Sequence, residues 1–314
     1  MVTRYLQATG GSSFFVTLPK DWVIRNKIKV KDPINISQTN NNSLVISGEH
    51  ADQKQIELDV DKISNNHLSR EIVASYVSGY KKIILTTNTY FSVEKRKVIR
   101  EQLKLIMGYE LNEEGPKKLV IDNTSNNNTP LSVQVIKMLK SIISMYEDFE
   151  IAIKNKYVDL CEDIIERDDE IDKANLYVTK KFMESLNNFG INNELTVSLT
   201  SVYFYQQQST RLERIADHIV KMSKEVVKSK TLELDEYNKK GLLVAEKYLK
   251  RIESLLITND KNTAHKVLDD FIELKKQNSK KHSFDEFNAI VNNTLERIVN
   301  YCANIAEDYI NILK

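Results

Sequence analysis

Helix-breaking residues and long apolar runs are both scarce in this chain of 314 residues. Only four prolines occur, none of them after Pro130, and beyond that point glycine is found only at Gly190 and Gly241. Such a stretch predicts long helices, interrupted near the two glycines. No apolar run approaches the roughly 18 residues that a membrane span requires, so we expect no insertion into a membrane.

Two cysteines, Cys161 and Cys302, are present without the CxxC spacing of metal or redox sites. Both fall on helical patterns, where we interpret them as small buried side chains in a reducing compartment. The N-terminus lacks the apolar segment of a secretory signal peptide, which together with the cysteines favours a cytoplasmic location.

Motifs of the common enzyme classes are also missing from the sequence. It contains neither a dinucleotide-binding GxGxxG loop nor a Walker phosphate-binding loop. Its five histidines are scattered without the spacing of metal ligands, and no nucleophile is paired with a base. We therefore expect a regulatory or binding protein and not an enzyme.

Charge is nearly balanced over the whole chain but not along it. Lysine and arginine number 45 against 44 acidic residues, for a net charge of +1. Residues 1–32 carry six basic residues against Asp21 and Asp32, which is a net charge of +4 and leaves −3 for the remainder. A basic segment at the N-terminus indicates an anionic partner there.

Residues 1–47 have the pattern of a small β domain. Two short strand-like runs flank the pair Gly10 and Gly11, and two more flank the turn at Asn40–Asn42. Between these pairs, the segment KDWVIRNKIK predicts a short helix. Because so few residues bury little surface alone, we expect this domain to form a homodimer.

The segment RYLQATGGSSFFVTLPKDW, with the helix and hairpin after it, resembles the SpoVT-AbrB swapped-hairpin family. The resemblance implies an interlaced dimer, which in many members is a transcription regulator that binds DNA through a basic face. The sequence departs from DNA-binding members around Ser12, Ser13 and Phe14, where many place an arginine. A dimerisation module with solvated basic side chains is therefore the alternative. The DNA-binding residues implied by the resemblance are Arg4, Lys20, Arg25 and Lys27.

Residues 48–130 alternate strand-like and helix-like segments in the order βαβαβ. The strand-like segments are QIELDV, KKIILTT and KKLVIDN, and the helix-like ones are HLSREIVASYVSGY and FSVEKRKVIREQLKLIMG. This pattern predicts a small α/β domain, which can serve as a spacer or as a ligand-sensing module.

One helical signature occurs twice in the remaining residues, as LERIADH at 212–218 and LERIVNY at 295–301. Each copy continues into the same apolar ladder, at Leu212, Ile215, Ile219 and Met222 and at Leu295, Ile298, Cys302 and Ile305. A repeated amphipathic helix indicates a tandem repeat, and long helices with short connections predict antiparallel bundles. We place the two repeats at 131–230 and 231–314.

Four carboxylates in the first repeat have the spacing of a binding site. Asp168 occupies a position of the heptad pattern over 157–178 that ordinarily holds an apolar residue, and Asp172 follows one turn later. Glu213 and Asp217 form a second pair at the same spacing. Buried carboxylates require a basic partner or a cation, and all-oxygen ligands suit Mg²⁺, Mn²⁺ or iron ions. The alternative is that Asp168 pairs with a basic side chain and the second pair is solvated.

The segments CEDIIERDDEIDK and RLERIADHIVKM resemble one repeat of the PhoU family of phosphate-uptake regulators, and NTLERIVNYCANIAED resembles the matching helix of a second repeat. The resemblance implies two similar three-helix bundles, with acidic motifs that bind metal ions in several members. It also implies action through contacts with a phosphate transporter and its signalling partners. Carried over to this chain, the metal ligands are Asp168, Asp172, Glu213 and Asp217.

The second repeat departs from this pattern. Asn300 stands in the place of Asp217, and Phe271 and Lys275 stand in the places of Asp168 and Asp172, so that only Glu296 remains. We therefore expect a divalent or iron-type metal ion in the first repeat and none in the second.

Together these patterns predict a mainly α-helical protein, with a swapped-hairpin β domain, a βαβαβ domain and tandem three-helix bundles. The combination resembles the archaeal type of PhoU-related regulator. We expect a DNA-binding transcriptional regulator of phosphate uptake whose helical body senses phosphate status. The alternative is an adaptor that binds no DNA and docks on a phosphate transporter or its ATPase.

Overall fold

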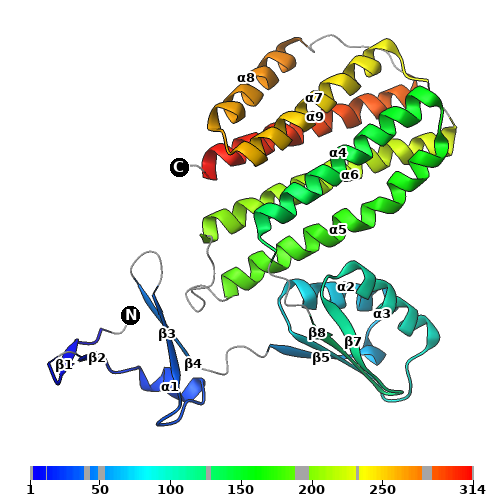
Figure 1. Cartoon of the computed structure of the whole chain (residues 1–314). Helices are drawn as coiled ribbons and strands as arrows, with labels where there is room; N and C mark the ends of the chain where they lie inside the picture. Colours follow the sequence, from blue (N-terminus) through cyan, green and yellow to red (C-terminus); the bar gives the residue numbers. More distant parts are fainter. Residues whose placement is uncertain are drawn as a thin grey trace. The chain divides into compact units, whose positions relative to one another are not determined.

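The structure, a computed structural model, describes residues 3–11, 13–38, 43–48, 54–124, 129–187, 198–230, 233–277 and 285–312. The predicted turn at Asn40–Asn42 and the departure at Ser12 lie outside the described residues. The chain forms two compact units, which divide between Lys54 and Gln55 (Figure 1). Within the described residues, no helix is long and apolar enough to cross a membrane.

The N-terminal unit consists of two separate antiparallel hairpins and a short helix. In the first hairpin the turn is made by Gly10 and Gly11, whose φ angles of 62° and 79° favour glycine. The elements are β1 (Gln7–Thr9), β2 (Ser13–Phe15), α1 (Lys20–Arg25), β3 (Ile34–Gln38) and β4 (Leu44–Gly48). β1 pairs only with β2, and β3 only with β4, among the described strands. The strands and helix expected here are thus confirmed.

The second unit begins with a four-stranded mixed sheet. Its elements are β5 (Gln55–Asp59), the 3-10 helix η2 (Val60–Lys62), α2 (Asn65–Val77), β6 (Lys82–Thr86), α3 (Val93–Leu105), β7 (Tyr109–Glu114) and β8 (Lys118–Asn123). The strand order is β5-β6-β8-β7, with β5 parallel to β6 and β8 antiparallel to both of its neighbours.

The sheet contains one strand more than the expected βαβαβ order. The sequence analysis did not predict β7, which joins β8 in a hairpin at the edge of the sheet. In β7 only Tyr109 is buried, and most of its other residues are acidic or amide side chains facing solvent. A strand with so few apolar positions gives a weak periodic signal, and its pairing with β8 determines its structure.

Six long helices form the rest of the described part of this unit (Figure 1). They are α4 (Leu131–Asn155), α5 (Val158–Asn187), α6 (Leu199–Ser229), α7 (Glu236–Thr258), α8 (Lys261–Gln277) and α9 (Glu286–Ile312). All six contribute to one continuous apolar core, in which α6 packs against α9 and α4 against α7. The predicted pair of three-helix bundles is confirmed. The expected break at Gly241 is wrong, because this glycine lies inside α7.

The first two helices of each bundle correspond at a spacing of 103 residues. Lys156 and Asn259 end α4 and α7 in the same left-handed conformation, and α5 and α8 then begin at Val158 and Lys261. An ion pair between the first and second helices confirms this register with its charges exchanged. It joins Asp148 to Arg167 in the first bundle and Arg251 to Asp270 in the second.

A buried lysine joins the helical bundle to the mixed sheet. The side chain of Lys180 on α5 is 3% exposed, and its ammonium lies 5.1 Å from the ring centre of Tyr76 and 4.6 Å from that of Tyr109. Its charge is paired with Glu184 at 3.4 Å. Burial lowers the pKa of Lys180, while Glu184 opposes this shift. Two aromatic faces and a carboxylate together offset the cost of burying the cation.

We predict that Lys180→Ala lowers the free energy of unfolding by about 2 kcal/mol, because it removes a desolvated cation–π contact and leaves a void beside the two rings. Lys180→Met keeps the apolar stem and should cost about half as much. Urea denaturation, followed by far-UV circular dichroism, measures both changes. Lys140→Ala, at an exposed position of α4, is the control and should change stability by less than about 0.5 kcal/mol. Equal stability of all three variants would contradict this role of Lys180.

Candidate functional site

The four basic residues predicted to bind DNA are all exposed in the N-terminal unit. Lys20 and Arg25 are the first and last residues of α1, and Lys27 follows the end of this helix. Arg4 precedes β1. Three of the four therefore lie on one short segment, where their positive charges are accessible to a polyanion.

Apolar side chains of the same unit are also exposed. Among its described residues only Ser47 is buried, whereas Val30 is 94% exposed and Tyr5 is 86% exposed. The other large apolar side chains that face solvent are Leu6, Phe14, Phe15, Val16, Ile24, Ile36 and Leu44. A small domain cannot be stable with most of its apolar residues in water, so these side chains require a partner surface.

The four predicted metal ligands lie on two helices that pack against each other. Asp168 and Asp172 are on α5, Glu213 and Asp217 are on α6, and all four are partly buried. Asp168 is the most constrained, since its Oδ1 atom is buried and has no hydrogen-bond partner. The alternative in which a basic side chain pairs with Asp168 is not what the structure shows, because neither Asp168 nor Asp172 forms an ion pair with a described residue.

The four carboxylates repel one another, and this repulsion contributes to the raised pKa values of three of them. Burial, reinforced by Asp172 and Asp217, raises the pKa of Asp168 to about 6. Burial and the charge of Asp217 raise the pKa of Asp172, and the same two causes raise that of Glu213 to about 7. Each group destabilises the ionised form of its neighbours, which is the condition that a bound cation relieves.

A nearby arginine forms ion pairs with two of these four carboxylates. The guanidinium of Arg214 lies 3.1 Å from Asp217 and 3.5 Å from Glu213. With these side chains so placed, no group of three histidine, cysteine, aspartate or glutamate residues in the described ranges is arranged to hold a metal ion. The donor atoms nevertheless suit a hard cation, since Asp168 offers a buried and unpaired carboxylate oxygen. Arg214 therefore competes with a bound cation for Glu213 and Asp217.

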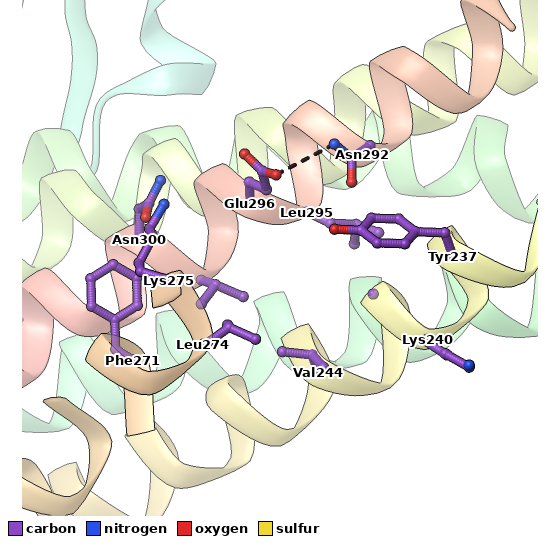
Figure 2. A pocket seen from close by; sticks show the side chains of 12 residues that line it. Tyr237, Lys240, Val244, Phe271, Leu274, Lys275, Asn292, Leu295, Glu296 and Asn300 are labelled. Atoms are coloured by element: carbon purple, nitrogen blue, oxygen red, sulfur yellow. Dashed lines mark hydrogen bonds between the residues drawn. The ribbon is translucent and has the colours of Figure 1, made fainter. Parts of the chain in front are cut away.

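The corresponding positions of the second bundle line a cavity. Phe271, Lys275, Glu296 and Asn300 all border a space of about 330 Å³ between α7, α8 and α9 (Figure 2). The sequence analysis identified these four positions as a lost metal site but did not predict a cavity. The signal for it was Gly241, a glycine in the interior of a helix, which also lines the space.

Comparisons with known proteins agree with this architecture. Residues 135–226, from α4 to α6, match the model of the PhoU domain. Residues 7–53 match the model of the antidote-toxin recognition domain MazE, a bacterial antitoxin. The chain contains a PhoU domain preceded by a MazE-type domain. Both resemblances predicted from the sequence are thereby confirmed.

One solved structure found to be similar is the phosphate transport system regulatory protein PhoU from Streptococcus pneumoniae. The alignment covers 59% of this chain and 93% of that chain, at 18% sequence identity and a TM-score of 0.46. A comparison with curated proteins finds no match. The PhoU domain suggests a role in regulating phosphate homeostasis, and its family is regulatory and non-enzymatic. The MazE-type domain is compatible with DNA binding.

We predict that each chain binds metal in its first bundle only, so that the amount of metal per chain does not exceed the content of that single site. Elemental analysis after purification without chelators measures this stoichiometry. The metal should be lost in the double variant Asp168→Ala and Asp217→Ala, because both carboxylates belong to the cluster. Glu296→Ala, which changes the corresponding glutamate of the second bundle, should retain it. Two equal sites per chain would contradict the prediction.

The raised pKa values also predict how stability depends on pH. Asp168 and Glu213 favour folding while they are protonated, so their contribution is present below about pH 4 and is lost as the pH rises through about 6 and 7. Metal-free protein should therefore unfold at lower urea concentration at pH 8 than at pH 5, with a difference attributable to these groups of about 1 kcal/mol.

The double variant Asp168→Asn and Glu213→Gln should remove this part of the pH dependence. Glu166→Gln, at an exposed position of the same helix, should leave it unchanged. If the double variant kept the full loss of stability between pH 5 and pH 8, the carboxylates would not repel one another as described.

Proposed function

We propose that this chain is a homodimeric, DNA-binding regulator of phosphate homeostasis, whose PhoU domain senses phosphate status in the cytoplasm. The observation that carries the proposal is the union in one chain of a MazE-type domain, with exposed basic residues, and a PhoU domain. The first supplies a means of binding an anionic polymer, and the second suggests the process that is regulated.

Two features of the N-terminal unit support dimerisation. Its two hairpins do not pair with each other among the described strands, and its apolar side chains face solvent. A second copy offers the same apolar residues and the same open strand edges, so strand pairing between two chains covers both. The two-fold axis of such a dimer would duplicate the basic segment around α1 and favour a palindromic DNA site.

We assign sensing to the helical body because two of the four carboxylates of the acidic cluster can interact either with Arg214 or with a bound cation. The carboxylates repel one another when no cation is bound, and Arg214 competes for two of them. Binding of a metal ion, alone or with phosphate as a further ligand, would draw Glu213 and Asp217 towards α5. Such a change alters the contact between α5 and α6, and through it the surface available to a partner.

The alternative function is that of an adaptor, in which the N-terminal unit only dimerises and the helical body contacts a phosphate transporter or its ATPase. The residues Ser13 and Phe14, which stand near the position where many DNA-binding relatives carry arginine, favour this version. So does the near-neutral charge of the whole chain. In this version a pull-down would retain transporter subunits and no nucleic acid.

The DNA-binding function predicts that the full chain binds a fluorescently labelled pool of duplexes at low salt and loses affinity steeply as salt is added. Fluorescence anisotropy across a salt series measures both. Each lost phosphate contact reduces the slope of log affinity against log salt by about 0.9. The triple variant Lys20→Gln, Arg25→Gln and Lys27→Gln should therefore bind at least about tenfold more weakly, with a shallower slope.

A control variant with three neutralised lysines on the helical body keeps the change in net charge the same. Lys137→Gln, Lys140→Gln and Lys154→Gln, all exposed on α4, should bind as the unmodified chain does. No binding of any duplex by the full chain at low salt would contradict the DNA-binding function and leave the adaptor.

A further inference from the structure

The cavity of the second bundle has the size and lining of a small-molecule site. Its volume of about 330 Å³ is at the lower end of the range for ligand pockets. Apolar side chains from three helices, among them Val244, Leu274 and Leu295, form its wall. Polar side chains are placed around them, with Lys275 and Asn300 near Phe271, and Glu296 beside Asn292 (Figure 2).

A large side chain of the first bundle is replaced by glycine at the wall of the cavity. At the spacing of 103 residues, Gly241 on α7 corresponds to Met138 on α4, which is 2% exposed and part of the core. At Gly241 even a Cβ atom would lie 3.1 Å from the Cδ1 atom of Leu295. Helix α7 therefore approaches Leu295 of α9 closely at this point, and a larger side chain here would displace Leu295, which lines the cavity.

The charge of the lining is reversed relative to the first bundle. Where α5 and α6 carry four carboxylates, the second bundle presents Phe271, Lys275, Asn300 and a single carboxylate, that of Glu296. Lys240 also borders the space, but its ammonium points away from it (Figure 2). Lys275 is therefore the cation of the lining that can meet a ligand, and it favours a negatively charged one, whereas four carboxylates favour a cation.

Lys275 is the residue best placed to bind an anionic group. Its ammonium lies 5.4 Å from the ring centre of Phe271, and among the described residues it forms no ion pair. Glu296 does not neutralise it, and instead accepts a long hydrogen bond of 3.4 Å from the Nδ2 atom of Asn292. The exposed cation thus lies over an aromatic ring at the edge of an apolar cavity, where it is accessible to an anion.

We propose that this cavity binds a small aromatic anion, with its ring between Val244, Leu274 and Leu295 and its phosphate or carboxylate group at Lys275. Asn300 lies on the same side and donates a hydrogen bond to that group. This site goes beyond the proposed function and does not depend on it, since neither DNA nor a bound metal takes part.

Phenyl phosphate is the probe for this proposal, and titration calorimetry of the full chain measures its binding. Benzyl alcohol tests the ring without the charge, and inorganic phosphate tests the charge without the ring. Phenyl phosphate should bind measurably at millimolar concentrations, and each of the two partial probes at least about tenfold more weakly, because each lacks one of the two contacts.

Two variants and one control assign binding to the cavity. Lys275→Gln, at an exposed position, should weaken phenyl phosphate binding at least about tenfold without affecting the fold. Gly241→Met should abolish binding, because its side chain would displace Leu295, which lines the cavity. Lys276→Gln, on the same turn but outside the lining, should bind as the unmodified chain does. If Gly241→Met fails to fold, Lys275→Gln decides alone.

The proposal is overturned if phenyl phosphate does not bind, if it binds Lys275→Gln as tightly as the unmodified chain, or if inorganic phosphate binds equally well. The DNA-binding assay does not involve these residues, so failure of this proposal and failure of the proposed function are distinguishable.

Discussion

The apolar core shared by α4 to α9 is the constraint on which the helical body depends. Because all six helices contribute to it, neither bundle can shift its helices without disturbing the other. The helix arrangement is consequently kept in both repeats, and the differences between them are restricted to side chains, such as Met138 in the core and Gly241 at the corresponding position. The ion pair between the first two helices of each bundle illustrates this restriction, since its charges are exchanged while its position is kept.

The same restriction explains how one arrangement of helices supports two kinds of site. In the first bundle Met138 belongs to the core, and the carboxylates around Asp168 repel one another. In the second bundle Gly241 and Lys275, at the positions of Met138 and Asp172, line a cavity. We conclude that the two repeats share their packing and differ in the charge of the side chains at corresponding positions.

Much of this structure was predictable from the sequence, because the relevant signals are local and periodic. The ladder from Leu212 recurs at Leu295, and it identified the repeat before any contact was known. Asp168 stood out since it interrupts an apolar heptad, and the structure leaves its Oδ1 atom buried without a partner.

Features that depend on tertiary contact were not predictable. β7 has little apolar periodicity and is ordered by its pairing with β8. Lys180 reads as an ordinary helical lysine, and only the folded chain places it between Tyr76 and Tyr109. Gly241 suggested the end of a helix, whereas the packing of α7 against α9 keeps the helix continuous through it.

The central claim is that the N-terminal unit is one half of a dimeric module that binds DNA. Sedimentation velocity of the full chain mixed with a fluorescently labelled duplex at low salt tests this claim most directly, because it reports stoichiometry and binding together. The account predicts that the label sediments with one duplex and two chains of 36.3 kDa each. A duplex that sediments alone, beside a chain that remains monomeric, would contradict it.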